Sequence, residues 1–219
     1  MMDFMGSPNI GIYSLTTDRY AIVPTGLQDS KIKNIEDCLK VTTVQTDICR
    51  SKLIGVFAAA NSNGIVLPKY AEDDEIENLM KLTGVNVERI DCKMTALGNL
   101  ILANDNGAVV SPLFMRMHSA LSSIQDTLGV EIGVGEIAGS PYVGSLGVAT
   151  NKGVLTHPET KEDERKKLME ILKVPIYNGT VNMGVPIVSS GLVANASGAL
   201  VGFITSGSEV FTISNALEV

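Results

Sequence analysis

The chain has 219 residues, of which 45% are hydrophobic, and its formal net charge at pH 7 is −7. This length allows one or two domains. No apolar run is long enough to span a bilayer, and the chain does not open with a basic and then apolar leader. Three cysteines give no disulfide framework. These features predict a cytoplasmic protein that makes no membrane contact. The acidic balance argues against binding that depends mainly on neutralising phosphates.

Five copies of one pattern follow one another along the chain. Each copy opens with a branched aliphatic residue followed by glycine, or by serine in the last copy, and the copies are 43 to 46 residues apart. These second positions are Gly11, Gly55, Gly98, Gly144 and Ser189. A turn residue comes six positions later and a second glycine nine positions later, with Tyr20 as the exception. Regular spacing of this kind is typical of a repeat fold, and it predicts one closed five-repeat domain over residues 1–219.

The second copy shows most clearly which elements a repeat contains. Residues 53–60 form an apolar run, residues 61–64 read Asn-Ser-Asn-Gly, and residues 65–68 form another apolar run. Asn-Gly between apolar runs indicates a β-hairpin, because both central residues of its tight turn need positive φ. The second copy therefore begins with two predicted strands.

A helix and a third strand are predicted to complete the second copy. Acidic residues open the segment, and Ile76, Leu79 and Leu82 then recur at helical spacing, which predicts a helix with these three side chains on its buried stripe. Residues 85–90 alternate as a strand. The other copies agree, with predicted third strands at 41–46, 130–137 and 174–180. Each copy thus reads strand, hairpin, strand, helix, strand, which makes the fold class α/β.

The two ends of the chain are predicted to meet. The fifth copy is short and has no third strand of its own, while residues 2–5 stand before Gly11 where third strands stand before the other glycines. Pairing the ends would close the ring and remove exposed sheet edges. A propeller of the WD40 type has a similar period, but it needs four strands per blade and a Trp-Asp motif, and this chain has no tryptophan.

Nucleophilic and metal chemistry find little support in the sequence. Cys49 and Cys92 occupy one repeat position that holds Met or Ala in the other copies, which favours a small packing layer near the ring axis. Cys38 lies on a helix, His157 ends a hairpin strand and His118 precedes the apolar face of a helix. Metal-ligand pairs and glycine-rich phosphate loops are absent. No catalytic residue, metal or cofactor is therefore predicted.

Asn99 differs from the other asparagines. Asn61, Asn104, Asn151 and Asn195 stand in hairpin turns, where turn geometry favours asparagine. Asn99 instead follows Gly98, and turn chemistry does not require an amide there. The five positions after the repeat glycine should share one face of the ring, and they are Ile12, Val56, Asn99, Ser145 and Ser190.

Several linked motifs resemble those of the archaeal and eukaryotic translation initiation factor 6 family. They include residues 95–99 (Thr-Ala-Leu-Gly-Asn), 104–107 (Asn-Asp-Asn-Gly) and 150–153 (Thr-Asn-Lys-Gly), together with residues 111–112, 143–145, 157–158, 174–175 and 179–182. The match runs in order from residue 10 to residue 209. The chain stops at Val219 without the extra C-terminal tail of the eukaryotic proteins, which favours the archaeal form.

The resemblance implies a pentein-type five-bladed α/β propeller that acts as a ribosome anti-association factor. Such a factor binds the intersubunit face of the large ribosomal subunit, against a basic ribosomal protein near the sarcin–ricin loop, and sterically prevents premature joining of the small subunit. A minor contact with ribosomal RNA stays open, and a monomer is expected. An acidic protein suits a basic protein partner.

The resemblance also implies which residues bind. The family's ribosomal contact uses the face after the repeat glycine, which points to Asn99 first and then to Val56, Ser145 and Ser190, with the Asn61 hairpin nearby. The alternative is an amidino-group hydrolase or transferase, because the pentein fold also hosts such enzymes. Their cysteine nucleophile lies near the C-terminus, whereas no cysteine follows Cys92 in this chain.

Overall fold

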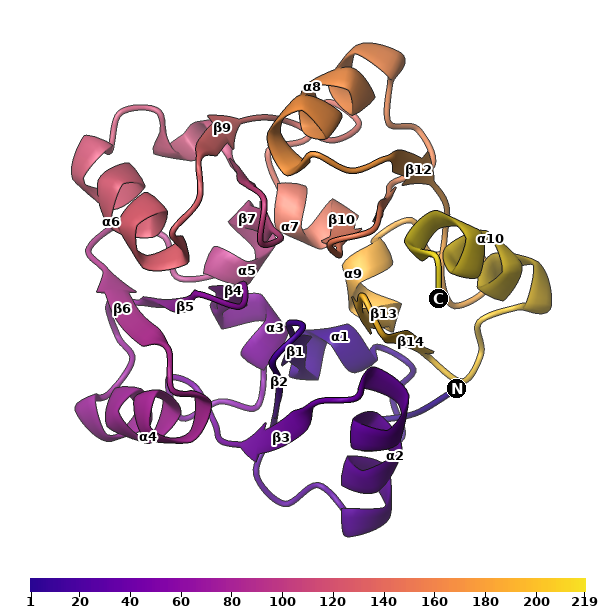
Figure 1. Ribbon diagram of the computed structural model, residues 1–219, viewed down its shortest axis with the longest axis horizontal. Coiled ribbons are helices and arrows are strands. Elements are labelled where there is room, and N and C mark those ends of the chain that lie inside the picture. The colour runs from indigo at the N-terminus through magenta and orange to yellow at the C-terminus, as the bar shows by residue number, and fades with distance from the viewer.

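The computed structural model describes all 219 residues, which form five blades around a central axis (Figure 1). Each blade begins with a four-residue helix beside the axis, continues as an antiparallel hairpin and places an eleven-residue helix at the rim. In the first four blades a third strand runs parallel to the second strand of the hairpin. The predicted five-bladed α/β propeller is confirmed.

The elements recur in the same order in every blade. The short helices are α1 (Ile10–Tyr13), α3 (Ile54–Phe57), α5 (Leu97–Leu100), α7 (Val143–Leu146) and α9 (Val188–Gly191). The rim helices are α2 (Asp29–Leu39), α4 (Asp73–Thr83), α6 (His118–Leu128), α8 (Glu162–Leu172) and α10 (Gly207–Leu217). A 3₁₀ turn, η1 (Pro112–Phe114), precedes α6.

The strands fall into three sets. First hairpin strands are β1 (Leu15–Thr16), β4 (Ala59–Ala60), β7 (Ile101–Ala103), β10 (Gly147–Ala149) and β13 (Leu192–Asn195). Second hairpin strands are β2 (Tyr20–Val23), β5 (Gly64–Pro68), β8 (Ala108–Val110), β11 (Val154–Thr156) and β14 (Gly198–Val201). Third strands are β3 (Thr42–Gln45), β6 (Asn86–Ile90), β9 (Ile132–Val134) and β12 (Ile176–Asn178).

The first predicted strand of each repeat is largely a helical turn instead. In the second blade, α3 occupies the first half of the apolar run and only Ala59 and Ala60 form a strand. The reason is the close approach of neighbouring backbones at the axis. A Cβ on Gly55 would overlap the Gly11 carbonyl oxygen, and a Cβ on Gly98 would overlap the Gly55 carbonyl oxygen. Because glycine has no side chain, adjacent short helices pack backbone to backbone.

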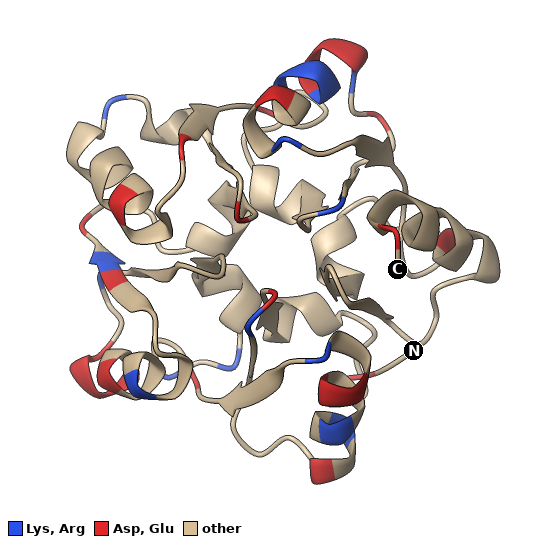
Figure 2. Ribbon diagram, viewed as in Figure 1, with Lys and Arg blue, Asp and Glu red and all other residues tan.

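The short helices close into a ring around the axis. Each one packs against the next, and α9 packs against α1. The contact between α7 and α9 differs from the others. Ser189 replaces the glycine there, and its Oγ donates a hydrogen bond to the Ser145 carbonyl oxygen at 2.8 Å. The sequences of these helices contain no charged residue, and Figure 2 shows most of the charge at the rim and in the loops.

The predicted pairing of the two chain ends is present but short. Met2 forms a parallel bridge with Gly202, and the Met2 N–H donates to the Val201 carbonyl oxygen at 2.9 Å. The fifth sheet otherwise has only the two strands β13 and β14. Both termini lie beside this blade (Figure 1).

Junctions between blades follow one rule with one exception. The second glycine of a hairpin packs against a carbonyl near the C-terminus of the next rim helix, so that a Cβ on Gly107 would overlap the Ile171 carbonyl oxygen. Tyr20 stands at this position in the first blade and is buried. Helix α4 packs less closely on β2 than the other rim helices pack on the second strand of the preceding blade. Leu82, predicted to be buried, is consequently 51% exposed, whereas Leu79 is fully buried.

Apolar side chains from neighbouring blades form five clusters around the ring, the largest between the second and third blades. The predicted stripes of the other rim helices lie in these clusters, with Ile35, Leu39, Ile124 and Leu168 all buried. Burial of aliphatic side chains on this scale supplies most of the folding free energy. No helix is both long and apolar enough to cross a bilayer.

Candidate interaction faces at the two ends of the central channel

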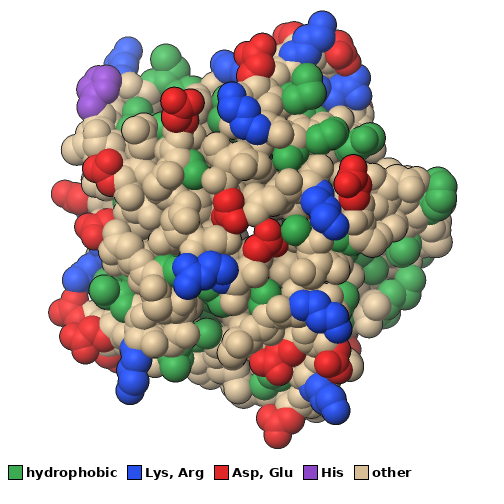
Figure 3. All heavy atoms as spheres, viewed as in Figure 1, with side chains coloured by type: hydrophobic (Ala, Val, Ile, Leu, Met, Phe, Trp, Pro, Cys, Tyr) green, Lys and Arg blue, Asp and Glu red, His purple; other side chains and the backbone are tan.

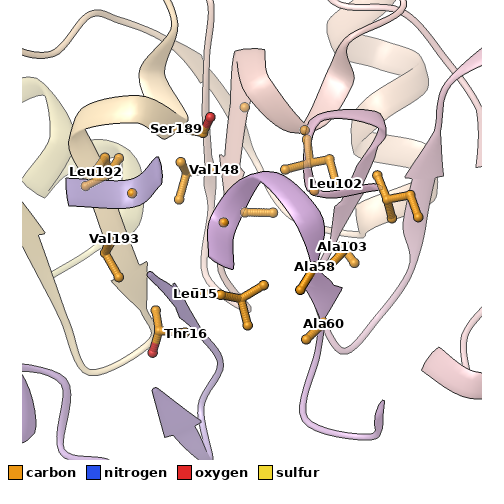
Figure 4. Close-up of a pocket in the computed structure, with 18 of the residues that line it drawn as sticks. Leu15, Thr16, Ala58, Ala60, Leu102, Ala103, Val148, Ser189, Leu192 and Val193 are labelled. Carbon is orange, nitrogen blue, oxygen red and sulfur yellow. The ribbon is translucent and has the colours of Figure 1, made fainter. Parts of the chain in front are cut away.

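A narrow channel runs along the axis between the first hairpin strands. Its wider part is a cavity of about 110 Å³ lined by small or aliphatic side chains, among them Leu15, Ala58 and Val148 (Figure 4). No charged side chain and no thiol lines this cavity. This cavity therefore offers no general acid, general base or thiolate nucleophile.

Hairpin turns surround one end of the channel, and their asparagines link neighbouring blades. The Asn61 Nδ2 donates to the Asn104 carbonyl oxygen at 3.2 Å and to the Leu128 carbonyl oxygen at 2.8 Å. Its Oδ1 accepts from backbone N–H groups of its own turn, at Asn63 and Gly64. Asn104 and Asn195 repeat this arrangement with the next turn and the end of the next rim helix. These buried amides hold the ring together.

Charged side chains also meet at this turn end. The Asn151 Nδ2 donates to Asp18 at 2.7 Å and to Asp105 at 2.6 Å, so one amide bridges two carboxylates. The Arg19 guanidinium donates to the Ser62 carbonyl oxygen at 3.0 Å. Figure 3 shows acidic and basic side chains close to the centre of the viewed face. This end of the ring is polar and its charges are largely satisfied by the chain itself.

The Asn61 side chain does not lie where a binding residue was expected. It is only 2% exposed, and both ends of its amide are used inside the ring. The strand β4 separates it from α3, so the Asn61 hairpin and the position of Val56 lie at opposite ends of the channel. The expectation that this hairpin lies near the post-glycine positions is therefore wrong.

The five short helices form the other end, which we call the short-helix face. Its post-glycine side chains are Ile12, Val56, Asn99, Ser145 and Ser190. The first four are half-buried, whereas Ser190 is buried and donates its hydroxyl to the Ile187 carbonyl oxygen at 2.7 Å. The Asn99 amide makes no hydrogen bond within the chain, unlike the amides of Asn61, Asn104 and Asn195. A partly exposed amide of this kind is free to pair with a partner.

Three large apolar side chains close to α9 in the chain or in the sheet are exposed. Ile187 is 47% exposed and directly precedes α9, and Met183 is 76% exposed in the tight turn before it. Phe203 is 49% exposed and follows β14, whose end is tied to α9 by the Gly202 N–H donating to the Gly191 carbonyl oxygen. Exposed large apolar side chains are candidates for contact with a partner.

Three glutamates that were not predicted from the sequence hold the loops leading into the short helices. The Glu75 carboxylate accepts from the N–H groups of Cys49 and Arg50. Glu164 and Glu209 bind the corresponding loops of the fourth and fifth blades in the same way. Each also caps its own rim helix as the third helical residue. The sequence signal that could have indicated these contacts is a glutamate at the third position of the rim helix.

The loop at Glu209 shows the electrostatic effect most clearly. Burial acts to raise the pKa of the Glu209 carboxyl, but N–H groups of Ser206 and Gly184 and the Thr180 hydroxyl donate to it. These bonds favour the charged form and lower its pKa to about 2. The carboxylate stays ionised and keeps the loop before α9 in place.

The cysteine position is a packing position, as predicted, but it does not lie at the axis: Cys92 is buried in one hydrophobic cluster, and Cys49 and Ala138 pack against two others. Met5, Cys49, Ala138 and Met183 stand in tight turns between blades with positive φ, between 51° and 64°. None of them lines the channel, so the predicted location was wrong. Burial, followed by Glu75 and Glu72, raises the pKa of the Cys49 thiol to about 11, and burial also raises the pKa of Cys92. Protonated thiols of this kind are poor nucleophiles.

The two histidines have local roles. The His157 Nδ1 accepts from the Glu159 N–H at 3.1 Å, and His118 is exposed at the start of α6.

Comparison with known proteins identifies the family. The eIF-6 family model matches residues 1–216. The chain belongs to the eIF-6 family. Curated relatives named translation initiation factor 6 include those of Pyrococcus horikoshii, 44% identical over 99% of this chain and 96% of the relative, and Saccharolobus islandicus, 44% identical over 99% and 97%. DDAH from Pseudomonas aeruginosa is a structural neighbour with a TM-score of 0.47 and 13% identity, covering 78% of this chain and 68% of that one.

Membership of the eIF-6 family confirms the resemblance drawn from the linked motifs. It also makes the chain a translation factor, since the curated archaeal relatives carry that name. The two ends of the channel differ in how many of their polar groups are free to bind a partner. The charged groups of the turn end are largely bonded within the chain, whereas the short-helix face carries the free Asn99 amide.

Proposed function

We propose that this protein binds the intersubunit face of the large ribosomal subunit through its short-helix face and thereby prevents premature joining of the small subunit. The observation that carries the proposal is the Asn99 amide, which is partly exposed and has no partner within the chain. It stands on a helix whose position is fixed by backbone packing of Gly98 against the preceding blade. A polar group on a backbone that is already ordered favours specific recognition, because little backbone entropy is lost on binding.

The charge of the chain supports a basic protein as the main partner. The net charge is −7, and no short helix contributes a basic residue. Attraction between an acidic factor and a basic ribosomal protein near the sarcin–ricin loop would speed their encounter. Contact with ribosomal RNA is a minor part of this proposal. Binding as a cytoplasmic monomer is enough, since a rigid ring on the joining surface excludes the small subunit sterically and no catalysis is required.

Val56 and Ser145 accompany Asn99 in the proposed contact. Both are half-buried on neighbouring short helices on either side of α5. Ser190 contributes less in this proposal, because it is 8% exposed and its hydroxyl is bonded to Ile187. The Asn61 side chain is left out because the ring uses it internally.

Sedimentation with separated archaeal ribosomal subunits tests the proposal. The protein should travel with the large subunit on a sucrose gradient, and the joined-ribosome peak should decrease. Asn99→Arg should weaken binding at least about tenfold, which corresponds to about 1.4 kcal/mol, with an unchanged circular dichroism spectrum. Asn106→Arg is the matched control, because Asn106 is exposed at the turn end.

Two results would contradict the proposal. The protein could stay at the top of the gradient while subunits join normally, which would remove the ribosomal partner. If Asn99→Arg and Asn106→Arg weakened binding to the large subunit equally, the short-helix face would not be the contact.

A further inference from the structure

The loop before α5 lacks a contact that the corresponding loops of the other four blades share. In those blades, the backbone N–H five positions before the second residue of the repeat donates to a carboxylate oxygen at 2.7 to 2.9 Å. The pairs are Gly6 with Asp3, Arg50 with Glu75, Gly139 with Glu164 and Gly184 with Glu209. Lys93 holds this position in the third blade, and its N–H donates to no acceptor within the chain.

The third rim helix explains the difference. The glutamates of the second, fourth and fifth blades are each the third residue of their rim helix, whereas Ala120 is the third residue of α6. Ala120 is buried in the same apolar cluster as Cys92, and Met94 packs against that cluster. Apolar contacts therefore hold this loop in place, and the N–H groups of Lys93, Met94 and Thr95 are left without an acceptor.

The charges around this loop favour a negative ligand. The Lys93 side chain is exposed and forms no ion pair within the chain. Residues 111–120, which lead into α6, include Arg116 and no acidic residue, whereas the other four rim helices each have an acidic residue in the first turn. Asp91 is the one acidic residue at the start of the loop, and it is exposed. Unpaired N–H groups beside an ammonium group attract an anion.

The other blades indicate which anion suits such a loop. In the second blade the two oxygens of Glu75 accept from the successive N–H groups of Cys49 and Arg50. The carboxylates of the fourth and fifth blades bind two successive N–H groups in the same way. In the third blade the Cys92 N–H is already bonded to the Ile90 carbonyl oxygen. The first two successive free donors are therefore those of Lys93 and Met94.

We propose that the loop before α5 binds a carboxylate side chain of the protein partner, with the Lys93 and Met94 N–H groups donating to its two oxygens and the Lys93 ammonium group beside it. The identity of this partner, a protein of the large ribosomal subunit, rests on the proposed function. The loop leads directly into α5, the helix that carries Asn99, so one surface of the partner meets both sites. A basic protein with an acidic residue at this point is thereby favoured over one without it.

Amide NMR of the 219-residue chain with small anions tests the chemistry of this site without the ribosome. At constant ionic strength, acetate should shift the Lys93 and Met94 amide signals saturably. Dimethyl phosphate, which represents the backbone of RNA, should shift them less at the same concentration. The Arg50 amide is the internal reference, because Glu75 already binds it. No shift with acetate would overturn the proposal, and a larger shift with dimethyl phosphate would assign the loop to RNA instead.

Sedimentation with the large ribosomal subunit tests the role of the loop in the contact. Lys93→Glu should weaken binding at least about tenfold, because it places a like charge against the partner carboxylate. Lys93→Gln keeps the N–H and should lose less affinity. Lys33→Glu, at an exposed position of α2, is the control for the change in charge and should bind as wild type. Unchanged circular dichroism spectra would show that the variants fold.

The outcomes separate this proposal from the proposed function. If Lys93→Glu binds the large subunit as wild type does, the loop takes no part in the contact and this proposal fails, while binding of the wild-type protein still supports the proposed function. If the wild-type protein does not sediment with the large subunit, the proposed function fails, whatever the acetate titration shows.

Discussion

The junction between the first and second blades differs from the other four, and the difference shows which contacts set the ring geometry. At four junctions a hairpin glycine lets the next rim helix approach until backbone meets backbone. At the first junction Tyr20 takes the place of glycine, and its hydroxyl donates to the Asn61 carbonyl oxygen at 2.8 Å. The ring thus tolerates a large side chain at this position where the helix end moves outward and exposes Leu82.

Tyrosine also replaces a second contact at this junction. In the second, third and fifth blades a buried asparagine bonds the next turn and the next helix end. The first blade has Thr17 at that position, and its hydroxyl bonds only within its own turn. One tyrosine therefore fills the space and supplies the bond to the next turn.

Truncating Tyr20 should have the largest effect on the stability of the ring. Tyr20→Ala removes a ring that is 2% exposed and leaves the Asn61 carbonyl oxygen without its donor. We expect a loss of about 3–5 kcal/mol in the free energy of unfolding, from the cavity and the lost bond together. Urea denaturation measures it. Tyr70→Ala, at a site 61% exposed, is the control and should change the stability by less than about 0.5 kcal/mol.

Adding a methyl group at a glycine junction should have the next largest effect. Gly107→Ala places a Cβ against the Ile171 carbonyl oxygen, and a backbone oxygen cannot rotate away. The expected loss is about 1–3 kcal/mol, measured by urea denaturation. Gly207→Ala, where a Cβ would meet nothing within 4 Å, should stay near wild type. Equal stability of the two variants would show that the rim helices adjust freely and that the glycine contact does not set the geometry.

The fifth blade has a glutamate, Glu209, that holds the loop before its short helix, whereas the first and third blades have none. Its contribution to stability should depend on pH. Its pKa is lowered to about 2 from a usual value of 4.5, so its stabilising effect is present above pH 4.5 and is lost as the pH falls toward 2. Glu209→Gln should cost about 2 kcal/mol at pH 7, and the difference from wild type should shrink over that window. Denaturation at several pH values measures this, with the exposed Glu170→Gln as control. A constant difference would contradict the ionised clamp.

The smallest expected effect is at Leu82. Leu82→Ser should change the free energy of unfolding by less than about 0.5 kcal/mol, because the displaced helix end already exposes this side chain. Leu79→Ser, on the same helix but fully buried, is the sensitive counterpart. Thermal denaturation of both variants is sufficient. A large loss at Leu82 would mean that α4 packs in solution as the other rim helices do.

The repeat pattern predicted much of the architecture but not the short helices beside the axis. The third strands at 41–46 and 85–90 contain β3 and β6, because alternation and turn residues are local signals. The helical turn of α3 inside an apolar run could not be predicted that way, since it depends on Gly55 meeting the backbone of the preceding blade. Leu82 was misjudged for the same reason, because its environment depends on Tyr20 in another blade.

The proposed contact residues stay predictions, and the structure adds how their side chains are bonded. Asn99 differs from the turn asparagines in the sequence, and in the structure it alone among Asn61, Asn99, Asn104 and Asn195 keeps its hydrogen-bonding groups free. Asn61 looked like a turn residue, and its bonds to Asn104 and Leu128 are tertiary contacts that spacing does not reveal. The glutamate clamps were missed because each one joins loops and helices about 25 residues apart.

Site-specific photo-cross-linking would show which end of the channel meets the large ribosomal subunit. A cross-linking side chain at position 56 lies on the short-helix face, and the same group at position 106 lies at the turn end. We predict cross-links to a ribosomal protein from position 56 and none from position 106. Cross-links from position 106 alone would contradict the proposed binding mode, because the internally bonded turn end would then face the ribosome.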